Sequence, residues 1–359
     1  MAYIDATDLY DLQVEGGINE KRFAEQGLLD ATKASSLAVD YIMPSDIAKM
    51  QSMDSIRSLQ IPVIQDQTVV VNATPGFTFI PSNLPTSAQY TFTAYDVFSG
   101  FRHYPATYGS NSVDADVAKK AVMKNVLYAM ANTVETTIAT VLETRKTQLL
   151  NFATQVSQGD GTYVFNGGTD TLEINKAAQK ETMFYNLAEL MKANEMDGDY
   201  RIVTSRGGLA IQKQLAQMFG ANNSENIAWD KNILSMDRLH ESGNISAAAA
   251  VFNGWYLRDG AVGLVENYPY DFRNGTVIGG KKWSVSDMEL PFLKMKANIY
   301  VNNEATDAQA LISGGASSDN TMTHFEEMAI WSRFYVVYPY NSDLTARTND
   351  VIKITGLTT

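Results

Sequence analysis

One long stretch of the chain, residues 113–152, contains neither glycine nor proline and repeats its apolar positions at helical spacing. The apolar side chains that share one face of this helix are Met123, Leu127, Met130, Val134, Ile138 and Val141. Steps of three and four residues are typical of an amphipathic helix, and Ser112 is a good N-cap for it. We therefore predict one helix over residues 112–152, about 60 Å long. A hairpin of two shorter helices is the alternative, although no turn residue interrupts the stretch.

The segment before this helix, residues 60–112, contains only three charged residues, and aromatic residues alternate with threonine in two places. The aromatic residues of these two places are Phe77, Phe79, Tyr90 and Phe92. Alternation with a period of two indicates strands with two different faces, and the proline- and serine-rich residues 81–87 indicate a turn between them. We therefore predict an extended hairpin.

An isolated two-stranded ribbon is only marginally stable in water, and its edges are free to pair with another chain. We therefore expect Phe77, Phe79, Tyr90 and Phe92 to contact a neighbouring subunit. On this segment alone, an internal strand pair of a larger sheet is an equally good interpretation.

The rest of the pattern predicts a mixed α+β chain. In the middle, a strand at Tyr163–Phe165, a helix at Glu181–Met196, a strand at Tyr200–Thr204 and a helix at Leu209–Phe219 are expected. From residue 250 onward the pattern changes to strands, at Val251–Leu257, Val262–Val265, Thr276–Ile278, Lys282–Val285, Leu293–Val301, Glu326–Tyr338 and Val351–Ile354. Residues 1–59 are acidic and polar, with short helical patterns only at Glu20–Leu29 and Asp46–Met53, so we interpret them as an arm.

Composition excludes several classes of function. The chain has no cysteine, which excludes disulfides, thiol nucleophiles and cysteine metal sites. Its three histidines, His103, His240 and His324, are far apart and do not have metal-ligand spacing. The net charge of −12 argues against binding nucleic acid through a basic surface. An acidic protein can lie beside nucleic acid without adhering to it.

No run of about 18 apolar residues is present, so no transmembrane helix is predicted. The first 19 residues contain no lysine or arginine and carry four acidic residues, a pattern that does not fit a secretory signal peptide. We therefore expect synthesis in the cytoplasm.

No catalytic, cofactor-binding or metal-binding residues are predicted, and we expect the protein not to be an enzyme. Residues 279–282, Gly-Gly-Lys-Lys, lack the spacing of a phosphate-binding loop and fit a hairpin turn. Residues 197–199, Asp-Gly-Asp, lack the further acidic ligands of a calcium loop. Glu326 and Glu327 are adjacent on a predicted strand, so their side chains point to opposite faces. His103 is expected to be a hydrogen-bonded turn histidine and not a base.

The order of these elements resembles that of the major capsid proteins of tailed bacteriophages, which have the HK97-like coat fold. The resemblance covers essentially the whole chain and rests on the order and composition of the elements. It implies an N-terminal arm over residues 1–59 and an extended hairpin, the E-loop, over 60–111. It also implies a spine helix with the first part of a peripheral domain over 112–197, an axial domain over 198–285, and the return strands of the peripheral domain with the C-terminus over 286–359.

The resemblance further implies that the protein assembles with itself, as hexamers and pentamers, into an icosahedral shell that encloses the double-stranded DNA genome. Neighbouring subunits would meet through the hairpin and the arm, and the protein would be found in the virion after assembly in the host cytoplasm. Only 59 residues precede the hairpin, which are too few for a fused scaffolding domain, so a separate scaffolding protein is expected. A portal and decoration proteins are further candidate partners. Residues 60–112 contain no lysine, so we expect no lysine–asparagine crosslink from this loop.

Two other functions fit the sequence less well. An encapsulin-like nanocompartment shell shares the same fold, and the sequence does not separate the two cleanly. A monomeric binding module or unrecognised hydrolase is the alternative from another class, but it leaves the uncharged hairpin unexplained.

Overall fold

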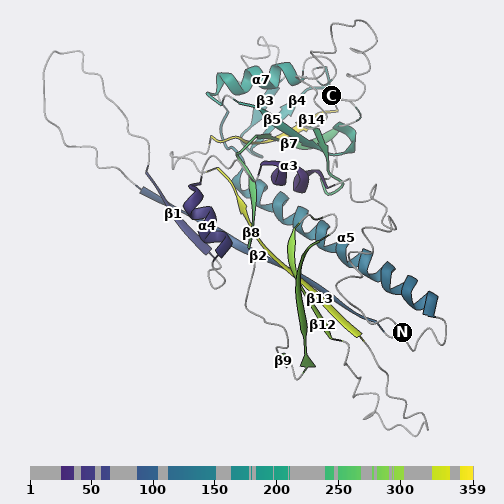
Figure 1. Cartoon of the computed structure of the whole chain (residues 1–359). Coiled ribbons are helices and arrows are strands. Elements are labelled where there is room, and N and C mark those ends of the chain that lie inside the picture. Colours follow the sequence, from purple (N-terminus) through teal and green to yellow (C-terminus); the bar gives the residue numbers. More distant parts are fainter. Residues whose placement is uncertain are drawn as a thin grey trace, which may run out of the picture.

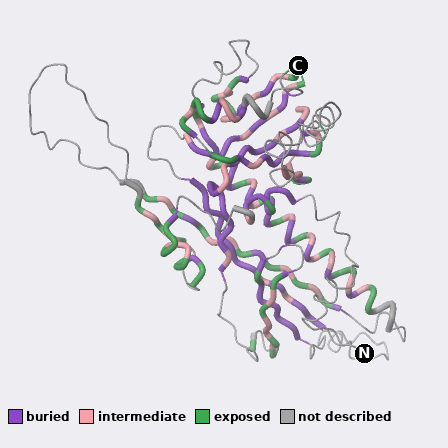
Figure 2. The backbone as a smooth tube through the Cα atoms, turned by 45° about the horizontal axis from the view of Figure 1, so that its top comes forward, coloured by how far each residue is buried: buried purple, intermediate pink, exposed green. Residues whose placement is uncertain are grey.

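The computed structural model describes residues 26–35, 42–52, 58–64, 87–103, 112–150, 163–177, 179, 183–196, 198–208, 210, 239–245, 250–267, 277–278, 281–290, 293, 295–302, 326–339 and 348–358. Within these residues the chain is a mixed α+β fold built on two sheets and one long helix (Figure 1). Buried residues run through the strands of both sheets (Figure 2). No helix in the described part has the length and apolar character needed to cross a membrane.

The long helix is α5, Ser112–Arg145, which is unbroken over 34 residues and about 50 Å long. All six apolar residues predicted for its inner face are buried: Met123, Leu127, Met130, Val134, Ile138 and Val141. The single-helix prediction is therefore confirmed, and the two-helix alternative is wrong.

Helix α5 ends seven residues earlier than predicted because the chain forms other hydrogen bonds there. The Asn349 side chain donates to the carbonyl of Arg145 at 2.8 Å. The Thr147 amide donates to the carbonyl of Val351 at 2.8 Å. These contacts satisfy groups that are left unpaired at a helix end, and they tie the end of α5 to the C-terminal strand.

The first sheet packs against α5 and has the order β1-β2-β13-β12-β11, with β8 also paired to β13. Its strands are β1 (Ser58–Ile64), β2 (Ser87–His103), β8 (Gly263–Asn267), β11 (Ser284–Glu289), β12 (Lys296–Asn302) and β13 (Glu326–Val337). All pairings within it are antiparallel. One edge of β13 is shared, because β12 pairs with its first part and β8 with its last part.

The second sheet has the order β3-β4-β14-β7-β5-β6, and helix α7 (Met183–Ala193) packs on it (Figure 1). Its strands are β3 (Tyr163–Asn166), β4 (Thr171–Ile174), β5 (Tyr200–Thr204), β6 (Leu239–Glu241), β7 (Phe252–Arg258) and β14 (Val351–Gly356). Leu187, Leu190 and Met191 of α7 are buried, as the helical pattern predicts. The short pair β9 (Val277–Ile278) and β10 (Lys281–Lys282) forms a separate hairpin, which confirms the turn predicted there.

Each of the two sheets combines strands that are far apart in the sequence, and the expected domain boundaries at residues 198 and 285 stay predictions. β3 and β4 precede residue 198 and β14 follows residue 285, yet all three belong to the same sheet as β5 and β7. Conversely, β8 lies within residues 198–285 but pairs with β13 of the other sheet. The cause is long-range pairing: β14 returns between β4 and β7, and no local sequence pattern encodes that return.

Two short helices of the N-terminal segment pack on the rest of the chain. Helix α4 (Pro44–Ser52) covers most of the helical pattern expected at Asp46–Met53 and begins two residues before it. Helix α3 (Gly27–Ser35) buries Leu28 and Leu29 in the same core as α5 and the first sheet. Residues 1–59 were predicted to form an arm, and this burial was not anticipated. The reason is that the apolar positions of α3 span only two helical turns, which is too short a pattern to recognise in the sequence.

Gly27 allows α3 to approach β6 closely. A Cβ at this position would lie 2.5 Å from the carbonyl oxygen of Glu241. We expect Gly27→Ala to reduce the free energy of unfolding by about 1–3 kcal/mol, since the backbone must shift to admit the methyl group. Urea denaturation would measure the loss, with Gly167→Ala as the matched control because no atom lies within 4 Å of its Cβ. Equal stability of the two variants would contradict the close packing of α3 on β6.

His103 is not in a turn as predicted. It is the last residue of β2, lies opposite Glu326 of β13 and is buried. The strand continues through Arg102-His103 because β13 supplies a pairing partner along this whole stretch.

Candidate assembly surfaces

Strand β2 changes its partner in the middle. Residues Ser87–Thr93 pair with β1, and residues Ala94–His103 pair with β13, without overlap. The β1–β2 ribbon therefore extends beyond the body of the first sheet (Figure 1). The predicted hairpin and the alternative of a strand pair within a larger sheet are both partly right, because β2 belongs to the ribbon at one end and to the sheet at the other.

One face of this ribbon packs on the subunit's own core. Phe92 is only 1% exposed, and its ring centroid lies 4.8 Å from that of Tyr338. Tyr90, Leu59 and Ile61 are partly buried against the same core. Leu59 pairs with Phe92 and Ile61 with Tyr90 across the strands. The sequence pattern anticipated two different faces, but the aromatic face near the base of the hairpin is covered within the subunit.

The four residues predicted to contact a neighbouring subunit are therefore not equivalent. Phe92 is a core residue, which leaves no surface for a neighbour to contact. Tyr90 is half-buried beside it. Phe77 and Phe79 lie outside the described residues.

The burial pattern of β2 changes phase where the strand changes partner. Before this point the even-numbered Tyr90 and Phe92 face the core, whereas beyond it Val97 is buried and Phe98 is 78% exposed. Side chains alternate between the two faces of a strand. A shift of one residue in this alternation therefore moves the following side chains to the other face. The outer face of the first sheet therefore carries Asp96, Phe98, Gly100 and Arg102.

This outer face has an aromatic centre between two ion pairs. Phe98 lies opposite Trp331 in the strand register. On one side, Arg333 donates to Asp96 at 2.6 Å, and the Trp331 indole N–H also donates to Asp96 at 3.2 Å. On the other side, Arg102 donates to Glu327 at 2.6 Å. The charged groups are thus neutralised within the subunit, and the centre remains apolar.

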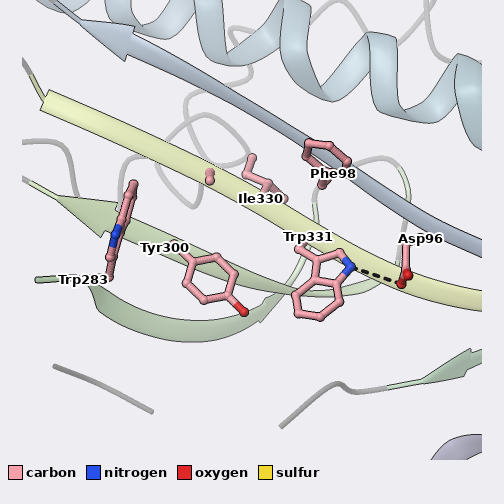
Figure 3. A pocket seen from close by; sticks show the side chains of 7 residues that line it. Asp96, Phe98, Trp283, Tyr300, Ile330 and Trp331 are labelled. Atoms are coloured by element: carbon pink, nitrogen blue, oxygen red, sulfur yellow. Dashed lines mark hydrogen bonds between the residues drawn. The ribbon is translucent and has the colours of Figure 1, made fainter. Parts of the chain in front are cut away.

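A hollow of about 410 Å³ opens on this aromatic centre (Figure 3). We call it the sheet-face hollow; its lining residues are Asp96, Phe98, Trp283, Tyr300, Ala329, Ile330 and Trp331. The side chains come from β2, β12, β13 and the residue before β11. Sequence analysis missed this surface because it depends on which residues lie opposite one another in β2, β13 and β12. The sequence signal was the pair of tryptophans Trp283, just before β11, and Trp331, in β13.

A second hollow, of about 470 Å³, lies along α5 next to Tyr95. Its lining is neutral: Tyr95, Asn132, Thr133, Thr136, Thr137, Thr140 and Val141. Each of the four threonine hydroxyls donates to the carbonyl four residues earlier, at 2.8–2.9 Å. The hydroxyls are occupied by the helix itself, so this groove offers mainly methyl groups.

Glu135 is a fully buried carboxylate in the middle of α5, at the junction of three chain segments. The amide of Leu28, in α3, donates to its Oε1 at 3.1 Å, and the Asn244 side chain donates to its Oε2 at 3.2 Å. Burial raises the pKa of Glu135 to about 7, although hydrogen bonds from Ser242, Leu28 and Asn244 act in the opposite direction. The sequence analysis did not identify Glu135, but its spacing from the buried residues Ala131, Ile138 and Leu142 places it on the inner face.

The described residues contain no group of three or more side chains that could hold a metal ion. Glu326 and Glu327 lie on β13 as predicted, and Glu327 is held by Arg102. Gly198 has a φ of +145°, as expected for a turn after a helix. Near the start of α5, Asp116 forms an ion pair with Lys119 at 3.5 Å.

No model of a known protein family and no curated protein sequence matches the chain. Distant similarity to solved structures extends over most of its length. A structure of Mycobacterium phage Adephagia is 14% identical, with 90% of this chain and 93% of that chain covered and a TM-score of 0.44. The capsid structure of the cyanophage P-SCSP1u is 12% identical over 86% of each chain, with a TM-score of 0.43. The capsid asymmetric unit of cyanophage Pam1 is 9% identical over 86% of this chain and 88% of that chain, with a TM-score of 0.44.

Proposed function

We propose that this chain is the major capsid protein of a tailed bacteriophage, with an HK97-like coat fold, and that it assembles into an icosahedral shell around the double-stranded DNA genome. The observation that carries the proposal is the change of partner in β2. The pairing of β2 with β13 ends at Ala94, and from there β2 pairs only with β1, in a two-stranded ribbon that precedes and follows residues 65–86 in the sequence. A monomeric binding protein has no need for such an extension, whereas a shell subunit uses one to reach its neighbour.

The remaining elements support the same function. The 34-residue helix α5 runs along the first sheet and joins it, at its C-terminal end, to the second sheet. In the proposal, α5 is the spine helix, and a peripheral and an axial domain are built around it. We propose that residues 1–59 and 60–111 supply the arm and the hairpin for contacts between subunits.

The charge of the chain suits a container for DNA. A net charge of −12 disfavours tight binding to phosphates, so the genome can be packed and released without adhering to the wall. In this proposal the protein acts as a structural component of the virion and not as an enzyme. A separate scaffolding protein, a portal and decoration proteins are its proposed partners, and assembly takes place in the host cytoplasm.

The contact energy between subunits is modest for each contact and large for the closed shell. Burial of apolar surface contributes about 25 cal/mol per Å², so a few hundred Å² at each hairpin contact contribute several kcal/mol before the costs of association. Many such contacts in a closed shell make it durable.

We expect Phe79→Asp to leave the subunit folded and to prevent shell formation, because a charge at an apolar contact between subunits must be desolvated. Circular dichroism would measure folding, and electron microscopy with sedimentation would measure assembly. Phe79→Leu is the control and should assemble, since it keeps an apolar side chain. Normal shells from the aspartate variant would exclude the hairpin as an essential contact, and the contents of wild-type particles would distinguish a capsid from a nanocompartment.

A further inference from the structure

Three aromatic side chains lie in a row across the sheet-face hollow (Figure 3). Trp331 is in β13, Tyr300 is in β12, and Trp283 directly precedes β11. Ala329, two residues before Trp331, pairs with Tyr300. Tyr300 also pairs with Val285, two residues after Trp283. Each ring therefore lies one strand across and two residues along from the previous one, so the row crosses the sheet diagonally.

The spacing of this row follows from the geometry of the sheet. Neighbouring strands are ~4.8 Å apart and two residues span ~6.7 Å along a strand, so successive rings start about 8 Å apart. Three rings in a row leave two gaps, and the centres of these gaps are separated by the same distance of about 8 Å. Space is open beside the row because Ala329 and Gly100, which pair across β13 and β2, have almost no side chain.

Trp331 is held in place by contacts within the subunit. Its indole N–H donates to Asp96 at 3.2 Å, and the Arg333 guanidinium lies 5.2 Å from the centre of its ring. Phe98 pairs with Trp331 across β2 and β13 and is 78% exposed. A ligand therefore meets an aromatic wall that is already ordered, which favours binding.

The charges around the hollow disfavour an ionic ligand. Asp96 is the one charged residue in the described lining, and Arg333 donates to both of its carboxylate oxygens, at 2.6 and 3.3 Å. An ion that enters the hollow would lose its hydration beside a carboxylate that is already neutralised. A cation would also be repelled by Arg333, which lies next to the ring of Trp331.

Among uncharged ligands, those with few polar groups fit best. The Trp331 N–H and the Asp96 carboxylate are engaged with each other, and the Tyr300 hydroxyl oxygen is buried. A saccharide would bring several hydroxyl groups into the hollow, and each of them needs a partner when it leaves water. Proline residues bring apolar rings and have no backbone N–H group, so they can be buried without leaving a donor unpaired.

The repeat of a proline-rich chain matches the spacing of the row. A polyproline II helix has three residues per turn and rises ~3.1 Å per residue, so prolines three residues apart lie ~9 Å apart on one face. The two gaps between the three rings are about 8 Å apart. Two such prolines can therefore enter the two gaps at the same time.

We propose that the sheet-face hollow binds an uncharged, proline-rich segment of another protein in the polyproline II conformation, with one proline on each side of Tyr300. Grooves lined by aromatic side chains are the usual recognition surfaces for such segments. The inference goes beyond the shell-forming function, because the site is complete within one subunit and its partner is a different protein.

Titration of the full-length protein with a synthetic decaproline peptide tests the proposal. We expect saturable binding by calorimetry, with a change in tryptophan fluorescence, since two of the four tryptophans of the chain line the hollow. A glycine–serine peptide of the same length is the control ligand. It should not bind, because it is a flexible coil without apolar rings.

Two variants locate the binding in the hollow. Trp331→Ala should weaken it about tenfold or more, as is typical when an aromatic anchor is removed. Ala329→Leu should weaken it to a similar extent, because the larger side chain fills the hollow while every aromatic ring remains. Val164→Leu is the matched control, since Val164 lies on β3 of the second sheet and is 41% exposed, and it should bind as the wild type does. Circular dichroism would establish that all three variants are folded.

The outcomes are decisive for this site and separate from the test of shell formation. No binding of decaproline to the folded wild type, or equal affinity of the wild type and Ala329→Leu, would overturn the proposal. Saturable binding of cellohexaose in place of decaproline, lost in the same two variants, would overturn it in favour of a saccharide site. Microscopy of assembled particles tests the shell-forming function independently, whichever of these results is obtained.

Discussion

Phe92→Asp is expected to unfold the subunit before assembly is reached. Phe92 is 1% exposed and packs on Tyr338, whose hydroxyl donates to the carbonyl of Thr91 at 3.1 Å. Loss of the buried ring costs about 3–5 kcal/mol, and a carboxylate buried there without a partner costs a further ~3–5 kcal/mol. Because whole domains are stable by only ~5–15 kcal/mol, most of the variant should be insoluble or unfolded.

Circular dichroism and the yield of soluble protein measure this effect. Phe98→Asp is the matched control, since it places the same charge on the same strand at an exposed position, and it should remain folded. A Phe92→Asp subunit with native stability would show that the inner face of the ribbon is not part of the core.

Raising the pH from 5 to 8 is expected to destabilise the subunit through Glu135. Burial raises the pKa of this carboxyl from 4.5 to about 7, so the folded chain holds its proton more tightly than the unfolded chain does. The stabilisation is complete below pH 4.5 and is lost as the pH rises through 7. A difference of one unit between the folded and unfolded pKa corresponds to ~1.4 kcal/mol. The free energy of unfolding should therefore fall by about 3 kcal/mol.

Glu135→Gln should remove this dependence and be more stable than the wild type at pH 8. Its single amide oxygen can still accept from Leu28, and the Asn244 amide can turn to accept from the new N–H group. Urea denaturation between pH 5 and 8 measures the effect.

Glu143→Gln is the control of opposite sign. Burial alone would raise the pKa of Glu143, but hydrogen bonds and charges from Lys146 and Lys353 outweigh it and lower the pKa. This variant should therefore lose stability at pH 8. If the free energy of unfolding of Glu135→Gln depends on pH as that of the wild type does, the dependence does not come from Glu135.

Local patterns were sufficient to predict most elements. The inner face of α5 follows from side chains that repeat every three or four residues, and each predicted residue of that face is buried. Six of the seven strands expected after residue 250 match observed strands to within three residues at each end, and the seventh, Lys282–Val285, overlaps both β10 and β11. The turns near Gly167 and Gly279 were also predictable, because each joins two strands that follow one another in the sequence and pair with each other.

Long-range pairing was not predictable in the same way. Nothing local to β14 indicates that it lies parallel to β4 and antiparallel to β7. The alternation around Phe92 indicates two faces, but which face is covered depends on Tyr338, more than 200 residues away in the sequence. The sheet-face hollow has the same origin, since Phe98, Trp331 and Tyr300 meet only through the register of three strands.

The central claim is that this chain forms a closed shell, and electron microscopy of the purified wild-type protein in negative stain, with light scattering on the same sample, tests it most directly. The expected result is shells, tubes or hexameric and pentameric capsomers with masses far above 39.5 kDa. A monomer at every concentration, also after addition of a scaffolding partner, would contradict the claim.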